Sequence, residues 1–114
     1  MYILIVEDQA EIAGNLQEVL TNEGHETQIA ATLEDARMIL DNQRPDIAFL
    51  DIYLPDGNGL DLLAYAGSIK FIVMTGTAQE ASLNHAFDRG AVAYLVKPFT
   101  LDDVLDAVTL AGES

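Results

Sequence analysis

Apolar residues form two alternating patterns along this chain. Short continuous apolar runs occupy residues 2–6 (YILIV), 47–50 (IAFL), 71–74 (FIVM) and 94–96 (YLV), with a weaker run at 26–30 (ETQIA). Short runs that are rich in β-branched and aromatic side chains, without strict alternation, are typical of strands buried on both faces. The runs therefore predict five strands of a parallel sheet.

The segments between these runs have the spacing of amphipathic helices, in which apolar residues recur at intervals of three and four. Three apolar stripes follow this spacing: Ile12, Leu16, Val19 and Leu20; Leu33, Ala36, Ile39 and Leu40; and Leu101, Val104, Leu105 and Val108. Three pairs resemble capping boxes at helix starts: Thr32 with Asp35, Thr77 with Glu80, and Thr100 with Asp103. A β–α unit repeated five times predicts an open α/β sheet with helices on both faces, in one domain spanning residues 1–114.

Composition narrows the class of protein. The chain of 114 residues has no cysteine, which excludes disulfides and thiolate metal sites and fits a cytoplasmic location. Its formal net charge of −14 would repel phosphate backbones and anionic lipid, and no apolar run approaches the ~18 residues of a membrane span. We therefore expect this chain not to bind nucleic acid or membranes directly.

Chemically useful side chains stand at four of the five predicted strand ends. Glu7 and Asp8 follow the first run, Asp51 the third, Thr75 the fourth and Lys97 the last. Taken singly, each is better explained as a solvated turn, a strand terminator, a helix cap or a surface charge. In an open α/β sheet, however, functional residues gather at the carboxyl ends of the strands, so these side chains should face a common cleft.

The combination of these side chains suits phosphoryl transfer. Close carboxylates repel one another unless a cation neutralises them, and oxygen ligands with open positions suit Mg²⁺. The Lys97 ammonium and the Thr75 hydroxyl would then be able to bind a second anion. Asp51 is the natural nucleophile, because an aspartate carboxylate can form an acyl phosphate.

Four motifs in this order resemble those of the response-regulator receiver domains of two-component signalling: ILIVEDQ, DIYLPDGNGLDLL, IVMTGTA and GAVAYLVKPF. The resemblance covers nearly the whole chain. It implies a flavodoxin-like (βα)5 fold, with a doubly wound five-stranded parallel sheet, in a phosphoprotein that signals to an output partner. The phosphoryl donor would be a sensor histidine kinase or a histidine phosphotransfer protein. The domain would catalyse only its own phosphorylation and dephosphorylation, without acting as an enzyme on a separate substrate.

The resemblance also implies roles for the matched acidic positions. Asp51 corresponds to the phosphoacceptor. Asp8 would bind Mg²⁺ directly and Glu7 mostly through water. Asp51 and the backbone carbonyl of Tyr53 would complete the ligands that the protein supplies to the metal.

Three further positions match the parts that couple phosphorylation to a change of shape. Thr75 corresponds to the switch hydroxyl, Tyr94 to the aromatic residue that turns inward when the hydroxyl moves, and Lys97 to the lysine that pairs with the phosphoryl oxygens. The peptide bond before Pro98 is generally cis in this family. The stretch from Asp51 to Thr75 is a few residues shorter than usual, so we expect a shortened third helix.

Two alternatives remain open. A phosphatase that forms an aspartyl phosphate and acts on small phosphate esters would need a second acid two residues after the nucleophile, where Tyr53 stands. A non-phosphorylated, receiver-like interaction scaffold would be indicated by the loss of an acidic ligand, the acceptor or the lysine, and all of these are present.

Overall fold

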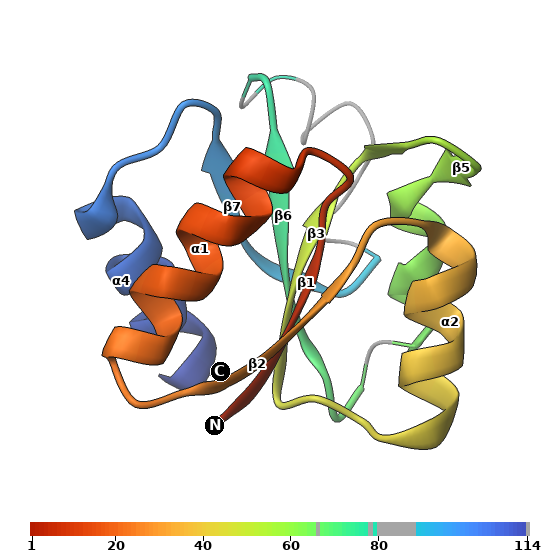
Figure 1. The fold of residues 1–114 in the computed structure, drawn as a ribbon, viewed down its shortest axis with the longest axis horizontal. Coiled ribbons are helices and arrows are strands. Elements are labelled where there is room, and N and C mark those ends of the chain that lie inside the picture. Colours follow the sequence, from red (N-terminus) through yellow and green to blue (C-terminus); the bar gives the residue numbers. More distant parts are fainter. Residues whose placement is uncertain (66, 78, 80–88, 114) are drawn as a thin grey trace.

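Five parallel strands form the central sheet of the computed structural model, which describes residues 1–65, 67–77, 79 and 89–113 (Figure 1). The strands lie in the order β2-β1-β3-β6-β7, and every neighbouring pair is parallel. Their bounds are β1 (Tyr2–Val6), β2 (Glu26–Ala30), β3 (Ile47–Asp51), β6 (Lys70–Thr75) and β7 (Ala91–Val96). The predicted doubly wound parallel sheet is confirmed, although β7 begins three residues before the predicted run at 94–96.

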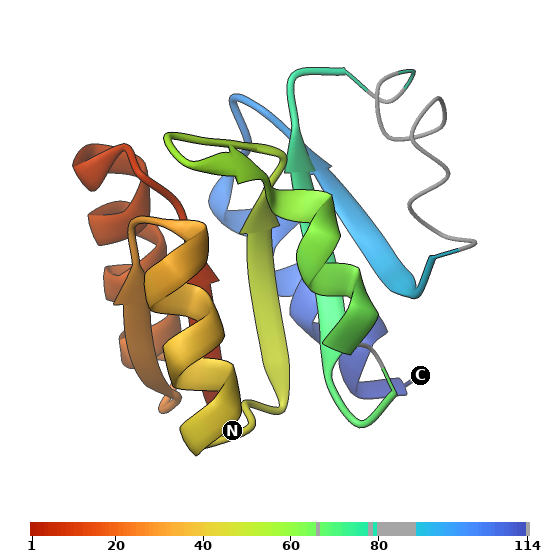
Figure 2. The ribbon, with the colours of Figure 1, turned by 90° about the vertical axis from the view of Figure 1, so that its right-hand side faces the viewer.

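Helices cover both faces of this sheet. Helices α1 (Ala10–Asn22) and α4 (Leu101–Glu113) lie on one face, and α2 (Leu33–Asn42) and the 3₁₀ helix η1 (Gly59–Tyr65) lie on the other (Figures 1 and 2). Successive side chains of a strand point to opposite faces, so each strand contributes to two separate apolar cores. Double burial explains the continuously apolar runs of the inner strands β1, β3 and β6. In the edge strand β7, Tyr94 and Val96 are 40% and 38% exposed, so the run at 94–96 is not buried on both faces as predicted.

The predicted helical stripes agree with the buried faces of α1 and α2 but not fully with that of α4. In α4 the buried residues are Val104, Ala107, Val108 and Ala111, while Leu101 is 54% exposed. The two alanines carry a weak apolar signal, so the larger leucines shifted the predicted stripe toward the edge of the true face. No helix in the described part of the chain is long and apolar enough to cross a membrane.

Two of the predicted helix caps are present in the structure. The Thr32 hydroxyl accepts a hydrogen bond from the Asp35 N–H at 3.1 Å. Thr100 and Asp103 form the reciprocal pair expected of a capping box, with backbone N–H to side-chain oxygen distances of 2.9 and 3.2 Å. The third predicted pair includes Glu80, which lies outside the described residues.

The third helix is shortened, as predicted, and it is a 3₁₀ helix rather than an α-helix. After β3 the chain forms a small antiparallel hairpin of β4 (Tyr53–Leu54) and β5 (Gly57–Asn58), and η1 then runs back toward the start of β6. A 3₁₀ helix rises about 2.0 Å per residue, against about 1.5 Å in an α-helix, so it spans more distance with few residues.

Packing of η1 on the sheet can be tested at two neighbouring positions. The Leu62 side chain is fully buried, whereas Asp61 is exposed. We expect Leu62→Ala to lower the free energy of unfolding by about 2–5 kcal/mol, because it leaves a cavity in the core. Asp61→Ala should change it by no more than about 0.5 kcal/mol. Urea denaturation followed by circular dichroism measures both, and equal effects would contradict the packing of η1.

Candidate functional site

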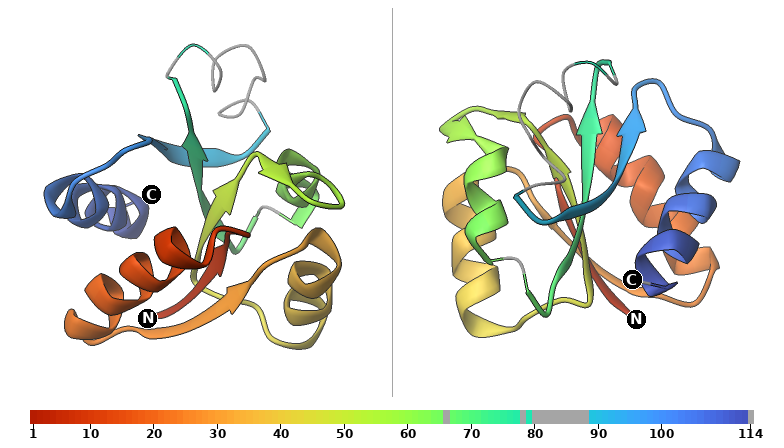
Figure 3. Two further views of the ribbon diagram at one scale, coloured as in Figure 1. Left: turned by 45° about the horizontal axis from the view of Figure 1, so that its top comes forward. Right: turned by 180° about the vertical axis from the view of Figure 1, so that it is seen from behind.

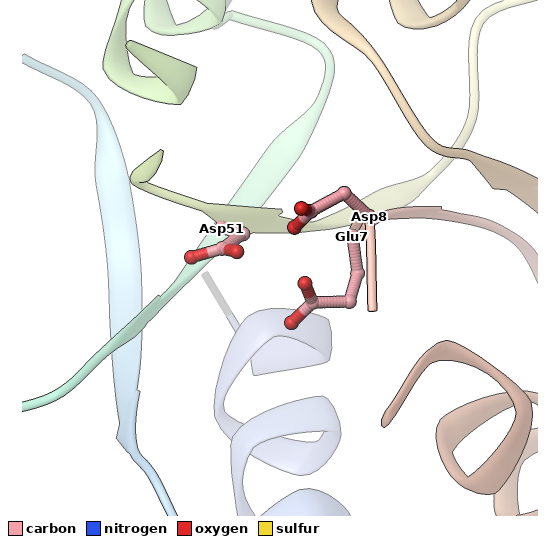
Figure 4. A group of neighbouring side chains, drawn as sticks. All are labelled: Glu7, Asp8 and Asp51. Atoms are coloured by element: carbon pink, nitrogen blue, oxygen red, sulfur yellow. The ribbon is translucent and has the colours of Figure 1, made fainter. Parts of the chain in front are cut away.

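Three carboxylates converge at the carboxyl edge of the sheet. Glu7 and Asp8 directly follow β1, and Asp51 is the last residue of the adjacent strand β3. Strand order changes direction between β1 and β3, which is where open α/β sheets bind ligands. One carboxylate oxygen from each residue lies within 4.8 Å of the others, and the three side chains face a shared space (Figure 4).

The three carboxylates differ in their surroundings. Glu7 is 1% exposed and Asp51 is 8% exposed, whereas Asp8 is exposed to solvent. One Glu7 oxygen, Oε2, accepts a hydrogen bond from the Gln9 N–H at 3.2 Å. Burial of two like charges next to a third is unfavourable without a neighbouring cation, since little water remains to screen them.

Lys97 supplies a positive charge to this cluster. Its Nζ lies 2.7 Å from Glu7 Oε1 and 3.4 Å from Asp51 Oδ2. Burial alone would lower the pKa of Lys97, but the hydrogen bond to Glu7 and the charge of Asp51 outweigh burial and raise the pKa above its usual value. The ammonium is therefore charged at neutral pH. The peptide bond to Pro98 is cis, as the resemblance to receiver domains implied.

Thr75 completes the polar wall of the site. It ends β6 and is 2% exposed, and its hydroxyl donates a hydrogen bond to the Thr77 carbonyl at 2.9 Å. Thr75 lines a cleft of about 370 Å³ together with Asp8, Asp51, Tyr53 and Lys97. In Figure 3 the arrowheads mark the carboxyl ends of the strands, and Asp51 and Thr75 are the last residues of β3 and β6.

Tyr94 stands apart from the cleft. Its side chain is 40% exposed on β7, where it lines a separate groove with Val96, Asp103 and Leu110 of β7 and α4. The structure therefore brings together the predicted carboxylates, hydroxyl and ammonium, and it leaves the predicted aromatic switch on an outer face.

Gly59 is a residue of the site that sequence reasoning missed. A Cβ atom at this position would lie 1.8 Å from the backbone oxygen of Asp51, and the Gly59 N–H donates to the Ile52 carbonyl. Only glycine allows the chain to approach the end of β3 so closely. The signal available in the sequence is the segment PDGNG, whose composition by itself indicates only a turn.

The assembled groups can hold a metal ion and an anion side by side. Carboxylate oxygens with solvent access are ligands for a hard divalent cation. The Lys97 ammonium and the Thr75 hydroxyl, which line the same cleft, are groups that bind anionic oxygens. This donor set can neutralise charge during transfer of a phosphoryl group.

Comparison with known proteins shows which protein family this chain resembles. Residues 3–109 match the family model described as the response regulator receiver domain. The transcriptional regulatory protein PdtaR of Mycobacterium tuberculosis is 34% identical over 113 residues, covering 96% of this chain and 55% of PdtaR. Sporulation initiation phosphotransferase F of Bacillus subtilis is 34% identical over 110 residues, covering 93% of this chain and 89% of that protein. The chain thus spans about half the length of PdtaR.

Solved structures agree with these relatives. A two-component response regulator from Clostridium difficile superposes with a TM-score of 0.89 at 25% identity, covering 99% of this chain and 96% of the other. A CheY-like response regulator receiver domain from Methanospirillum hungatei superposes with a TM-score of 0.84 at 31% identity, covering 99% and 98%. The similarity extends over the whole fold described above.

Two glycines offer a matched test of the close approach at Asp51. We expect Gly59→Ala to lower the free energy of unfolding by about 1–3 kcal/mol, because the added methyl group must displace the end of β3. Gly14 lies within α1, and nothing lies within 4 Å of a Cβ added there. Gly14→Ala should instead stabilise the protein by about 0.5–1 kcal/mol. Chemical denaturation of both variants gives the comparison, and a neutral Gly59→Ala would refute the constraint.

Proposed function

The chain belongs to the response regulator receiver family and functions as a phosphoacceptor receiver domain, and on this premise we propose that Asp51 is the phosphoacceptor. The observation that carries this assignment is the convergence of Asp51 with two further carboxylates and Lys97 at the carboxyl edge of the sheet. Receiver domains are phosphorylated by histidine kinases or phosphotransfer proteins and are in general signalling domains rather than enzymes. We propose a donor of this class for this chain.

In the proposed reaction, a carboxylate oxygen of Asp51 attacks the phosphorus of a phosphohistidine. A phosphorus–oxygen bond forms as the phosphorus–nitrogen bond breaks, and the imidazole leaves with the bonding electron pair and takes up a proton. The Lys97 Nζ is already 3.4 Å from Asp51 Oδ2, so the ammonium can form an ion pair with the phosphoryl oxygens once the group is transferred. Hydrolysis of the acyl phosphate by water would reset the site.

The residues present fit Mg²⁺ as the cofactor of this reaction. Asp8 and Asp51 would be direct ligands, and the backbone carbonyl of Tyr53 would add a third oxygen. Both Glu7 oxygens already have protein partners, Lys97 and the Gln9 N–H, which supports a role for Glu7 mostly through water. When bound, the ion neutralises carboxylate repulsion and the charge that develops on the transferred group.

Thr75 and Tyr94 are the proposed route from the phosphoryl group to the surface. Thr75 would exchange its hydrogen bond to Thr77 for one to a phosphoryl oxygen. Both residues lie on the paired strands β6 and β7, and Tyr94 pairs in register with Val73. Movement of the hydroxyl would make room for Tyr94 to turn inward from its present exposed position.

The two alternative functions are less well supported. The known relatives are response regulators, which does not favour a phosphatase of small phosphate esters or a non-phosphorylated scaffold. Tyr53, two residues after Asp51, also lacks the acidity that a phosphatase would need to protonate its leaving group.

The identity of the acceptor can be tested with acetyl phosphate and Mg²⁺. Asp51→Asn should abolish the covalent phosphorylation that intact-mass spectrometry detects, because an amide oxygen is too weak a nucleophile to form the acyl phosphate. The matched control is Asp61→Asn, at an exposed aspartate of η1, and it should be phosphorylated like the wild type. Phosphorylation of Asp51→Asn to the wild-type level would overturn the assignment.

The metal site predicts a rise in melting temperature with Mg²⁺. A free Mg²⁺ concentration about a hundredfold above the dissociation constant should add about 2.7 kcal/mol to the free energy of unfolding. Asp8→Asn should erase most of this increment and should also stabilise the metal-free protein, because it removes one of the repelling charges. Asp102→Asn, at an exposed position of α4, is the control. An intact increment in Asp8→Asn, measured by thermal denaturation, would refute the proposed ligand set.

A further inference from the structure

The β4–β5 hairpin is attached to a helix that takes no part in the site described above. Asp56 lies at the tip of this hairpin, between Leu54 and Gly57. Its Oδ1 accepts a hydrogen bond from the Leu33 N–H at 2.8 Å, and its Oδ2 accepts one from the Glu34 N–H at 3.1 Å. These are the first two amides of α2, and the hairpin lies directly above the start of that helix in Figure 1.

The charged form of Asp56 makes this contact. The hydrogen bond from Leu33 is the largest cause that holds the pKa of Asp56 below its ordinary value, and the bond from Glu34 acts in the same direction. Because the pKa of Asp56 is lower in the folded chain than in the unfolded chain, its contribution to stability is complete above the unfolded-state pKa, and so at neutral pH, and is lost as the pH falls through the folded-state pKa. The start of α2 therefore receives a permanent carboxylate from the hairpin, in addition to its own cap at Thr32.

Apolar packing holds the same two elements together. Gly57 has a φ of +151°, and a Cβ atom there would lie 2.7 Å from Leu33 Cδ1. Leu54, on the other strand of the hairpin, belongs to the same core cluster as Leu33. The hairpin is thus fitted closely against the first residue of α2 as well as hydrogen-bonded to it.

The position of the Tyr53 carbonyl depends on the anchors of this hairpin. Each strand of the hairpin has only two residues, with Tyr53 opposite Asn58, and so short an isolated pair is not stable by itself. Its base is closed by the hydrogen bond from the Gly59 N–H to the Ile52 carbonyl, beside Asp51. Its tip is held by Asp56. Loss of the Asp56 hydrogen bonds would remove the polar anchor of the tip and leave its apolar packing against Leu33.

We propose that Asp56 is a positioning residue for the metal site, because it clamps the loop carrying the Tyr53 carbonyl onto the start of α2. This inference rests on the proposed function, in which that carbonyl is a metal ligand. Linkage makes the effect reciprocal: if the clamp strengthens metal binding by some factor, metal binding strengthens the clamp by the same factor. The amides of Leu33 and Glu34 then report on a metal bound at the far end of the loop.

Two caps of the same helix provide the test. Asp56→Ala removes the clamp, whereas Thr32→Ala removes a cap of the same first turn of α2 without touching the hairpin. Both variants should melt a few degrees below the wild type. Only Asp56→Ala should also weaken the binding of Mg²⁺, by about tenfold, as expected for a group that orients a ligand. Calorimetric titration of the metal-free proteins with Mg²⁺ measures this affinity.

Asp56→Asn and hydrogen exchange cover the case in which Asp56→Ala does not fold. The asparagine keeps one oxygen acceptor for an α2 amide, so its Mg²⁺ affinity should fall between those of the wild type and Asp56→Ala. In the wild type, Mg²⁺ should slow amide exchange at Leu33 and Glu34. The clamp would be overturned if the wild type binds Mg²⁺ but amide exchange at Leu33 and Glu34 is not slowed and the Mg²⁺ affinity of Asp56→Asn is not reduced. That result would leave the proposed function unchanged. If the wild type itself does not bind Mg²⁺, the proposed metal site and the clamp both fail.

Discussion

Repulsion among three close carboxylates is the constraint on which the rest of this site depends. Glu7, Asp8 and Asp51 have oxygens within 4.8 Å of one another, and two of the three are buried. Lys97 offsets part of the repulsion through contacts to Glu7 and Asp51. The same contacts stabilise its charged form and raise its pKa. The cluster remains net negative, so it favours ligands that bring positive charge. In the proposed reaction, phosphorylation of Asp51 would draw the Lys97 ammonium toward the phosphoryl oxygens.

The parallel sheet brings these charges together. Residues 7 and 51 are far apart in the chain, but β1 and β3 are neighbours and end at the same edge. Two apolar cores, one on each face, hold the strands in register, so the polar ends have little freedom to separate. Folding energy from the cores thereby maintains a cluster that would not form on a flexible chain.

The segment between Asp51 and β6 connects this cluster to the rest of the protein. It is short, and it contains a hairpin with two-residue strands and a 3₁₀ helix. Gly59 allows the segment to pass against the end of β3, and Asp56 attaches it to α2. The segment that carries the Tyr53 carbonyl, the proposed metal ligand, is therefore held in place by these two contacts. Thr75 lines the cleft at the end of β6, and Tyr94 lies outside the cleft on the neighbouring strand β7.

Local sequence determined the strands, most helices and the side chains of the cleft, because each depends on a pattern that adjacent residues carry. Runs such as 2–6 and 47–50 indicated buried strands, and the order of strands and helices was enough to expect Asp8, Asp51 and Lys97 at one edge. Thr100 with Asp103 likewise formed the cap that their spacing predicts.

Only the tertiary structure decided what distant residues do to one another. The partner of Asp56 is an amide 23 positions earlier in the chain, and the need for glycine at position 59 arises from the backbone of Asp51. Leu101 lies outside the buried face of α4 because that face is set by contact with the sheet. Such effects depend on distances between elements, and a pattern of neighbouring residues contains no record of those distances.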